Sequence, residues 1–438
     1  MNAFQVVFND FMWLSMLLLV GFLIRKNVRI VQSLYLPAAL IGGFLGLLLG
    51  PQVLGKYTQC CLPFSVNIAK WPGILITLVF SVQFLGSDPV DFNEAALSGY
   101  CLAVIGHMSQ VIIGMLCAAF FVQYYPQLPI SFGITPVFGF YGGHGTAVAA
   151  GQTLTELGWA DGMAVANTMA TAGLISGIVV GMMIINVGVR RGYAKLAMSP
   201  SNLPKEMREG YIPINKRKAI GWGVTGNDVL DPFVFHLAIA GIICFCAYKA
   251  NAWLKFIPVP AFAWGLILGY FIWEILKKMK IEHCIDRKTV NRVSGLAMEY
   301  LICSAIATLN IDIFKNYLIP IFITILVMIV ANVIVYTYFG SHIFRQDWFE
   351  RTVGSFGQGS GVLATGLMLV RVLDPELKTS GAGCIAAASV LGYTVSMPFL
   401  AFAPTLVLSM NSYIFLAINV AILLAFVGVA RVFFWKKW

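Results

Sequence analysis

The feature that most constrains the fold is the recurrence of long apolar stretches along the whole chain. Clear examples cover residues 11–24, 101–122, 318–338 and 414–429, each near the length of roughly 20 residues that a helix needs to cross a bilayer. Composition agrees, because 59% of the 438 residues are hydrophobic and only 11% are charged. The sequence therefore predicts an all-α polytopic membrane protein.

The positive charges set the predicted orientation. A net charge of +10 suggests a polyanionic partner. In a membrane protein, however, the distribution of Lys and Arg between the two sides indicates the orientation of the chain and explains the excess of positive charge. With the N-terminus outside, the predicted cytoplasmic segments hold every Lys and Arg except Lys56, Lys70, Lys249, Lys255 and Lys315. We therefore expect about eleven spans, a cytoplasmic C-terminus and no nucleic-acid partner. The first span is expected to stay in the mature chain, since its basic cluster follows it.

Two glycine-rich segments must enter and leave the membrane on the same side for this orientation to hold. The first, near residues 130–157, contains FYGGHGTAVAAG and opens outside, whereas the second, near 353–373, opens inside. Broken backbone at membrane depth is tolerated only where it is buried in protein or lines a wet cavity. Both segments are therefore interpreted as re-entrant hairpins. Gly42, Gly43 and Gly46 are instead interpreted as sites of close helix packing.

Internal repetition divides the chain into two halves. LPAALIGGFLG (36–46) resembles VPAFAWGLILG (259–269), and GFYGGHGTAVAAGQTL (139–154) resembles GSFGQGSGVLATGLML (354–369). Because the halves face opposite ways, we predict inverted-topology repeats, a pattern typical of secondary transporters with a midplane site. The predicted domains are an N-terminal helix at 1–30, a first repeat at 31–190, a cytoplasmic linker at 191–230, a second repeat at 231–410 and an extra C-terminal helix at 411–438.

Two motifs carry a family resemblance. GGHGT (142–146), followed by the small, polar AVANTMATAGLISG (164–177), resembles the bacterial glutamate:sodium symporter (ESS) family, and FGQGSG (356–361) with ATGLMLVRVLDP (364–375) looks like its second pore-loop region. The resemblance implies sodium-driven uptake of glutamate, a substrate site at two hairpin tips and an elevator-like movement of the domain that carries them. It also implies a homodimer in the bacterial cytoplasmic (inner) membrane. The extra C-terminal helix and Arg371 depart from the family pattern.

The chemistry of the tips follows from their backbone. Glycine-rich tips expose N–H and C=O groups that no helix satisfies and that a ligand can satisfy. Helix N-termini favour carboxylates, while carbonyls and hydroxyls suit a desolvated sodium ion. The predicted substrate-binding residues are Gly142, Gly143, His144, Gly145, Thr146, Gly357, Gln358, Gly359, Ser360, Gly361, Thr365 and Arg371.

Several of these side chains have two interpretations. His144 either donates to a substrate carboxylate or fixes the hairpin by a structural hydrogen bond. Arg371 either clamps a carboxylate in two parallel bonds or extends to the membrane interface. A sodium site is predicted at Asn167, Thr168 and Thr171, for which a helix–helix contact is the alternative.

Three function classes are compatible with a polytopic membrane protein of this kind. An intramembrane enzyme needs a nucleophile with a base or paired acids at membrane depth, and neither is evident. A channel also uses re-entrant loops, but its filter usually comes from symmetric rings of subunits. We therefore predict a symporter for glutamate or a related carboxylate, with another organic anion or amino acid as the alternative substrate.

Sodium is the expected coupling ion, and no cofactor is expected. No transition-metal site is expected either, since the nine cysteines show no C-x-x-C spacing. The ionisable His107, His236 and Glu299 fall in predicted spans outside these sets.

Overall fold

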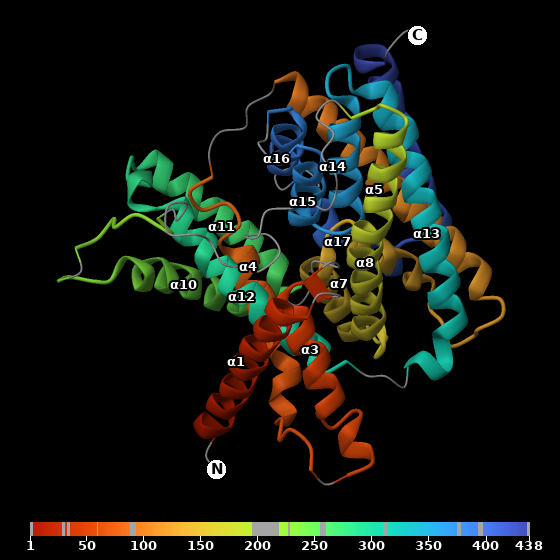
Figure 1. The fold of residues 1–438 in the computed structure, drawn as a ribbon. Helices are drawn as coiled ribbons and strands as arrows, with labels where there is room; N and C mark the ends of the chain where they lie inside the picture. The colour runs from red at the N-terminus through yellow and green to blue at the C-terminus, as the bar shows by residue number, and fades with distance from the viewer. Residues whose placement is uncertain are drawn as a thin grey trace. The chain divides into compact units, whose positions relative to one another are not determined.

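The regular structure is helical and contains no strand wherever the chain is described, as predicted. The computed structural model describes residues 3–28, 31–32, 36–58, 60–87, 93–194, 219–226, 228–254, 260–309, 313–374, 378–392 and 397–435. The chain forms two compact units, and each takes segments from both halves of the sequence. The first unit comprises Met1–Pro89 and Lys205–Asn310, and the second comprises Val90–Pro204 and Ile311–Trp438. Figure 1 labels most of the α-helices of both units.

The first unit contains six α-helices and three short 3-10 turns among its described residues. The α-helices are α1 (Ala3–Asn27), α3 (Ala38–Leu49), α4 (Trp71–Ser81), α10 (Pro232–Trp253), α11 (Ala261–Lys278) and α12 (Arg287–Ala307). The turns are η1 (Leu54–Lys56), η2 (Val66–Lys70) and η6 (Glu282–Cys284). Helix α3 packs on α1 and α12, helix α11 packs on α10 and α4, and α4 and α12 pack on each other.

The first repeated motif gives the same local structure in both of its copies. Helix α3 begins after Pro37 and α11 begins after Pro260, and both prolines have extended backbone with ψ of 146° and 157°. A proline before a helix suits this geometry because it fixes φ and lacks the N–H that the first turn leaves unbonded. The two copies therefore start their helices by the same means.

The glycines of that motif permit close helix contacts. A Cβ added to Gly43 would lie 2.7 Å from Ile306 Cβ, and one added to Gly46 would lie 2.7 Å from Ala307 Cβ. A Cβ added to Gly42 would lie 2.5 Å from the carbonyl oxygen of Leu17. These separations are too short for a side chain, so α3 approaches α1 and α12 nearly backbone to backbone. The packing interpretation of these glycines is confirmed.

The second unit contains all of the predicted substrate and sodium residues. Its elements are α5 (Glu94–Phe121), η3 (Ile130–Ile134), α6 (Thr135–Phe140), α7 (Gly143–Glu156), α8 (Gly162–Arg190), α13 (Ile313–Ile343), α14 (Trp348–Ser360), α15 (Leu363–Leu373), α16 (Gly381–Leu391), α17 (Met397–Ser409), α18 (Ser412–Val429) and the π-helical turn η8 (Ala430–Phe434). Helix α5 starts where the Asn93 side chain accepts the Ala96 N–H at 2.8 Å, an N-cap bond. It packs on α13, α16 and α18 and is the central helix of this unit.

Seven helices among the described residues are long and apolar enough to cross a membrane. They cover Phe4–Asn27, Ala38–Lys56, Glu94–Phe121, Gly162–Arg190, Pro232–Trp253, Asn316–Ile343 and Ser412–Phe434. The last of them lies within the predicted extra C-terminal helix at 411–438. A multi-pass membrane protein is therefore confirmed, whereas the predicted total of about eleven spans stays a prediction. Most of the predicted linker at 191–230 lies outside the described residues.

Candidate functional site

The first glycine-rich segment folds as a pair of helices, α6 and α7, with a break at Tyr141 and Gly142, which we term the first tip. Gly143 opens α7 with φ of +66°, in the left-handed region that glycine adopts without strain. The Thr146 hydroxyl donates to the carbonyl oxygen of Phe138 at 2.6 Å and so closes the pair across its own break. Thr146 and Gly142 touch so closely that a Cβ on Gly142 would meet the Thr146 side chain.

His144 joins the first tip to α8. Its Nε2 lies 3.1 Å from the Thr171 hydroxyl oxygen, and that hydroxyl also lies 3.0 Å from the carbonyl oxygen of Asn167, to which it donates. The Thr171 hydrogen is used in that bond, so the imidazole Nε2 is the donor to Thr171. His144 is buried, and one of its two nitrogens is occupied by this bond. The structural role proposed for His144 is therefore present, and with the proton on Nε2 the Nδ1 of the neutral ring is an acceptor.

The second glycine-rich segment also folds as a pair of helices, α14 and α15, with a break at Gly361 and Val362, which we term the second tip. Val362 has extended backbone, with ψ of 169°, and serves as the N-cap of α15. The pair packs tightly, since a Cβ on Gly357 would lie 2.9 Å from Gly366 Cα. Helix α14 begins at Trp348, five residues before the predicted start of the segment at 353. The predicted segment began later because a charged Arg351 is expected in solvent, whereas Arg351 is buried here.

The two tips touch each other. A Cβ on Gly143 would meet the Val362 side chain, and it would lie 3.5 Å from the carbonyl oxygen of Gly361. The N-termini of α7 and α15 therefore face one region, and within the described chain neither N-cap residue makes a side-chain capping bond. Converging helix N-termini carry positive partial charge and unbonded N–H groups, which suit an anion.

Helix α8 lies behind the meeting tips. A Cβ on Gly173 would lie 2.8 Å from the carbonyl oxygen of Ser360 and 3.0 Å from Phe140 Cα, so one glycine borders the last residues of both α6 and α14. Gly177 borders Ser360 as well, with 3.4 Å between its added Cβ and Ser360 Cβ. The small residues of AVANTMATAGLISG thus let both pairs approach one helix.

A buried amide network holds the second tip. Gln110 Nε2 on α5 donates to the carbonyl oxygen of Gly359 at 2.7 Å and to Asn332 Oδ1 on α13 at 3.0 Å. Asn332 Nδ2 in turn donates to the Ser360 hydroxyl oxygen at 3.3 Å. Sequence reasoning did not include Gln110 or Asn332. The available signal was the presence of an amide side chain in each of two strongly apolar spans.

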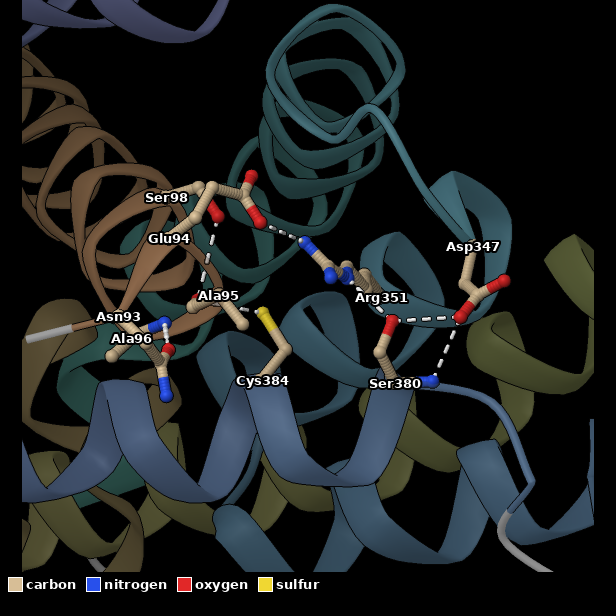
Figure 2. A network of polar contacts seen from close by, with 9 residues as sticks. All are labelled: Asn93, Glu94, Ala95, Ala96, Ser98, Asp347, Arg351, Ser380 and Cys384. Carbon is tan, nitrogen blue, oxygen red and sulfur yellow. Dashed lines mark hydrogen bonds and ion pairs between the residues drawn. The ribbon is translucent and has the colours of Figure 1, made fainter. Parts of the chain in front are cut away.

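A charged network holds the base of the second pair (Figure 2). Arg351 on α14 lies between two neighbours, with Nη1 3.2 Å from Glu94 Oε2 on α5 and Nε donating to the Ser380 hydroxyl oxygen at 2.8 Å. Ser380 donates its N–H and its hydroxyl to Asp347, at 2.8 and 2.7 Å. Arg351 is only 3% exposed, whereas the Glu94 side chain is 51% exposed. One arginine therefore ties α14 to α5 and to the start of α16.

Three further predicted residues on the second pair lie in different places. Gln358 turns toward α16, where its Nε2 donates to the Ser389 hydroxyl oxygen at 2.8 Å. Thr365 is buried in the first turn of α15, and a Cβ on Gly361 would lie 2.8 Å from its hydroxyl oxygen. Arg371 is exposed and stands in the last turn of α15, eight residues beyond its first residue. The structure brings Thr365 to the tip and does not bring Arg371 there.

The predicted sodium residues lie on α8 beside the first pair. Thr168 and Thr171 donate their hydroxyls to the carbonyl oxygens of Ala164 and Asn167, one turn back on the same helix. Asn167 is 1% exposed, and its Oδ1 has no hydrogen-bond partner among the described residues. A buried amide oxygen without a donor suits a hard cation such as sodium. In the described part of the chain no cluster of three His, Cys, Asp or Glu side chains is placed to hold a metal ion.

Comparison with known proteins gives one clear result. The family model described as sodium/glutamate symporter matches residues 6–355, which include the first pair and most of α14. No curated protein matches the chain.

Proposed function

The chain belongs to the sodium/glutamate symporter family, and from this premise we propose that it takes up glutamate by an elevator-type alternating-access mechanism. The family is one of transporters and not of enzymes, and it uses sodium as the coupling ion rather than as a bound cofactor. The observation that supports a substrate site most directly is the meeting of two helix N-termini at Gly143 and Val362. A dicarboxylate amino acid is the kind of anion that such a place favours.

We place the substrate against the two tips. We propose that backbone N–H groups of the first turns of α7 and α15 bind a carboxylate, with the predicted Gly142, Gly143, Gly145 and Gly361 at or beside the breaks. The predicted Gly357 and Gly359 contribute by close packing, against Gly366 and Tyr336. His144 stands in the first turn of α7, Thr365 in the first turn of α15, and Ser360 ends α14 just before the second tip, so we propose these side chains as further substrate contacts. Thr146 and Gln358 act by holding the tips, since both are engaged in bonds within the unit.

We place sodium beside Asn167. The unpartnered Asn167 Oδ1 supplies one ligand, and the hydroxyl oxygens of Thr168 and Thr171 retain lone pairs for a cation while they donate to the helix backbone. Thr171 also contacts His144, so an ion here lies one hydrogen bond away from the first tip. That short connection is a physical route for coupling ion binding to substrate binding.

The elevator proposal rests on the composition of the units. The second unit contains both helix pairs with α5, α8 and α13, and we propose that it moves as the transport domain while the first unit is the scaffold. Inverted repeats with re-entrant hairpins are supported by the matching starts of α3 and α11 and by the presence of one helix break in each pair. A homodimer in the bacterial inner membrane is proposed from the family likeness.

Uptake into proteoliposomes tests the function. Purified protein is expected to take up labelled L-glutamate in a saturable way that needs an inward sodium gradient and stops when potassium replaces sodium. Competition by L-aspartate, other organic anions and neutral amino acids then fixes the substrate class. Flux that does not saturate would favour a channel, and saturable flux of another organic anion would favour the alternative substrate.

Orientation has its own test in the native cysteines. We propose an outside N-terminus and a cytoplasmic C-terminus, which puts the exposed Cys60 outside and the partly exposed Cys284 inside. An impermeant thiol reagent added to intact cells should label a variant that keeps only Cys60 and spare one that keeps only Cys284. The reverse pattern would invert the proposed topology.

A further inference from the structure

His107 is a buried histidine without a protein partner. It lies on α5, is 1% exposed, and neither Nδ1 nor Nε2 has a hydrogen-bond partner among the residues that the structure describes. The first unit offers a contrast in His236, which is 2% exposed and fully engaged. Its Nδ1 lies 2.6 Å from the carbonyl oxygen of Pro232, and its Nε2 accepts the Asp286 N–H at 2.9 Å. A buried imidazole can therefore be satisfied in this protein, and His107 is not.

The position of His107 is beside the tips. Its ring packs on the Tyr141 ring at the first tip, with 4.7 Å between centroids. One turn along α5, Gln110 bonds to Gly359 just before the second tip. Helix α5 thus contacts both tips through residues at i and i+3, which share one face.

Two neighbouring polar atoms are unpartnered as well. Gln110 Oε1 and the Tyr336 hydroxyl have no hydrogen-bond partner within the described chain, and both residues are buried. The Tyr336 ring lies directly on Gly106 and Gly359, as a Cβ on either glycine would meet its hydroxyl end. Donors and acceptors without partners therefore gather on α5 and α13 beside the two helix N-termini.

Burial of such groups has a cost. A buried polar group without a partner destabilises a fold, whereas an apolar side chain of the same shape avoids this penalty. A phenylalanine would keep the contact with Tyr141, so packing alone does not explain an imidazole at this position. A ligand that enters the site supplies the missing partner.

We propose that His107 is a substrate-binding residue whose ring N–H donates to a carboxylate oxygen of the transported amino acid. The inference rests on the proposed function and adds a third wall, α5, to the site at the two tips. Gln110 Oε1 is an acceptor on the same face, and it receives a hydrogen from the substrate ammonium group. Together with the helix N-termini, these atoms give complementary donors and acceptors for a zwitterion.

The test compares His107→Phe with His236→Phe, using the full-length protein in detergent and in proteoliposomes. For His107→Phe we expect an unchanged or higher melting temperature without ligand, because an unpartnered buried imidazole is removed. The stabilisation that L-glutamate produces at saturating sodium should be lost, and KM for uptake should rise about tenfold or more, as for the loss of about 1.4 kcal/mol. His236→Phe should lower the melting temperature and keep the glutamate-induced stabilisation.

The outcomes separate this inference from the proposed function. Parental KM and parental glutamate-induced stabilisation in His107→Phe would overturn the role of His107 while glutamate uptake stands. Glutamate-induced stabilisation that is present in the parent protein and lost in His107→Phe, without any uptake by the parent, would support His107 and overturn the transport proposal. If the phenylalanine variant cannot be purified, His107→Leu, which fits within the same volume, gives the same comparison.

Discussion

The two helix pairs match in sequence and each has one break, which comes five residues later in the second pair when the two motifs are aligned, and the pairs are held in different ways. The first pair closes on itself through Thr146 and Phe138 and bonds to α8 through His144. The second pair is held by its neighbours, with Gln110 at the tip and Arg351 at the base. The first pair thus depends on one bond within itself and one to α8, whereas the second depends on α5, α13 and α16.

This difference assigns different tasks to the two pairs. A tip that is closed by its own residues keeps its shape when helices around it shift, which suits a fixed part of a binding site. A tip that is bonded to three other elements changes position when those elements move, because it must either follow its bonding partners or exchange those bonds for others. We expect the second tip to be the one that changes position between substrate-free and substrate-bound states.

The largest expected effect is at the contact between the tips. Gly143→Ala places a side chain in the left-handed region, which costs about 1–2 kcal/mol, and forces it against Val362, which costs about 1–3 kcal/mol more. A combined loss of about 3 kcal/mol corresponds to a fall of about a hundredfold in glutamate uptake at limiting substrate.

Gly192→Ala is the matched control for this prediction. Gly192 has φ of +73°, and no atom lies within 4 Å of its added Cβ, so the substitution tests the backbone cost alone. Its uptake should stay near the parental value. Equal losses in both variants would show that the tip contact adds nothing to the strain of the backbone.

A smaller effect is expected at the base of the second pair. Arg351→Met removes the bonds to Ser380 and Glu94 and should lower the free energy of unfolding by about 2 kcal/mol, as charged hydrogen bonds contribute about 1.5–3 kcal/mol. Glu94→Gln should cost less than about 1 kcal/mol, since the Glu94 side chain is half exposed and water replaces the ion pair. Melting temperatures of the two variants measure the difference. Equal destabilisation would mean that the ion pair, and not the bond to Ser380, holds the base.

The next effect concerns the bond that closes the first pair. Thr146→Val keeps the side-chain volume but removes the hydroxyl that bonds to Phe138, so uptake should fall about fivefold for a loss of about 1 kcal/mol. Thr153→Val on the same helix removes only a bond to the carbonyl oxygen of Ala149, one turn back, and should transport like the parent. Uptake assays on both variants decide whether the first pair is closed by Thr146, and parental uptake by Thr146→Val would contradict that description.

The sequence predicted the breaks of both pairs better than their surroundings. Glycine clusters and the charge count predicted broken segments near residues 130–157 and 353–373, and the breaks at 141–142 and 361–362 lie inside them. The partners of the second tip were missed, since Gln110 and Asn332 are 222 residues apart and their bond is made only in the fold. His107 was noticed as ionisable, but its proximity to Tyr141 was not visible in the sequence. Arg351 was counted as a cytoplasmic charge, and only the structure shows that it is buried.

Arg371 was predicted to bind the substrate, but it lies at the far end of α15 from the second tip. It belongs to the second pair, as Arg351 does, but it is exposed in the last turn of α15, at about 12 Å from the first residue of that helix by the rise of 1.5 Å per residue. If Arg371 anchors at the membrane interface, Arg371→Lys keeps the charge and its reach, so KM for glutamate should stay within about twofold of the parental value. If Arg371 clamps a carboxylate, the lysine loses the planar fork, and KM should rise about tenfold or more.

We expect the smaller effect, because the geometry leaves the guanidinium at the opposite end of α15 from the tip. Arg351→Lys serves as the positive control, since a lysine cannot reproduce both the Nε bond to Ser380 and the contact with Glu94, and the melting temperature should fall. The comparison is made at saturating sodium, so that a weakened ion site is not mistaken for weakened substrate binding. A tenfold rise in KM for Arg371→Lys would mean that α15 presents its C-terminal end, as well as its N-terminus, to the substrate during the transport cycle, and carboxylate recognition would then involve more than the tips and α5.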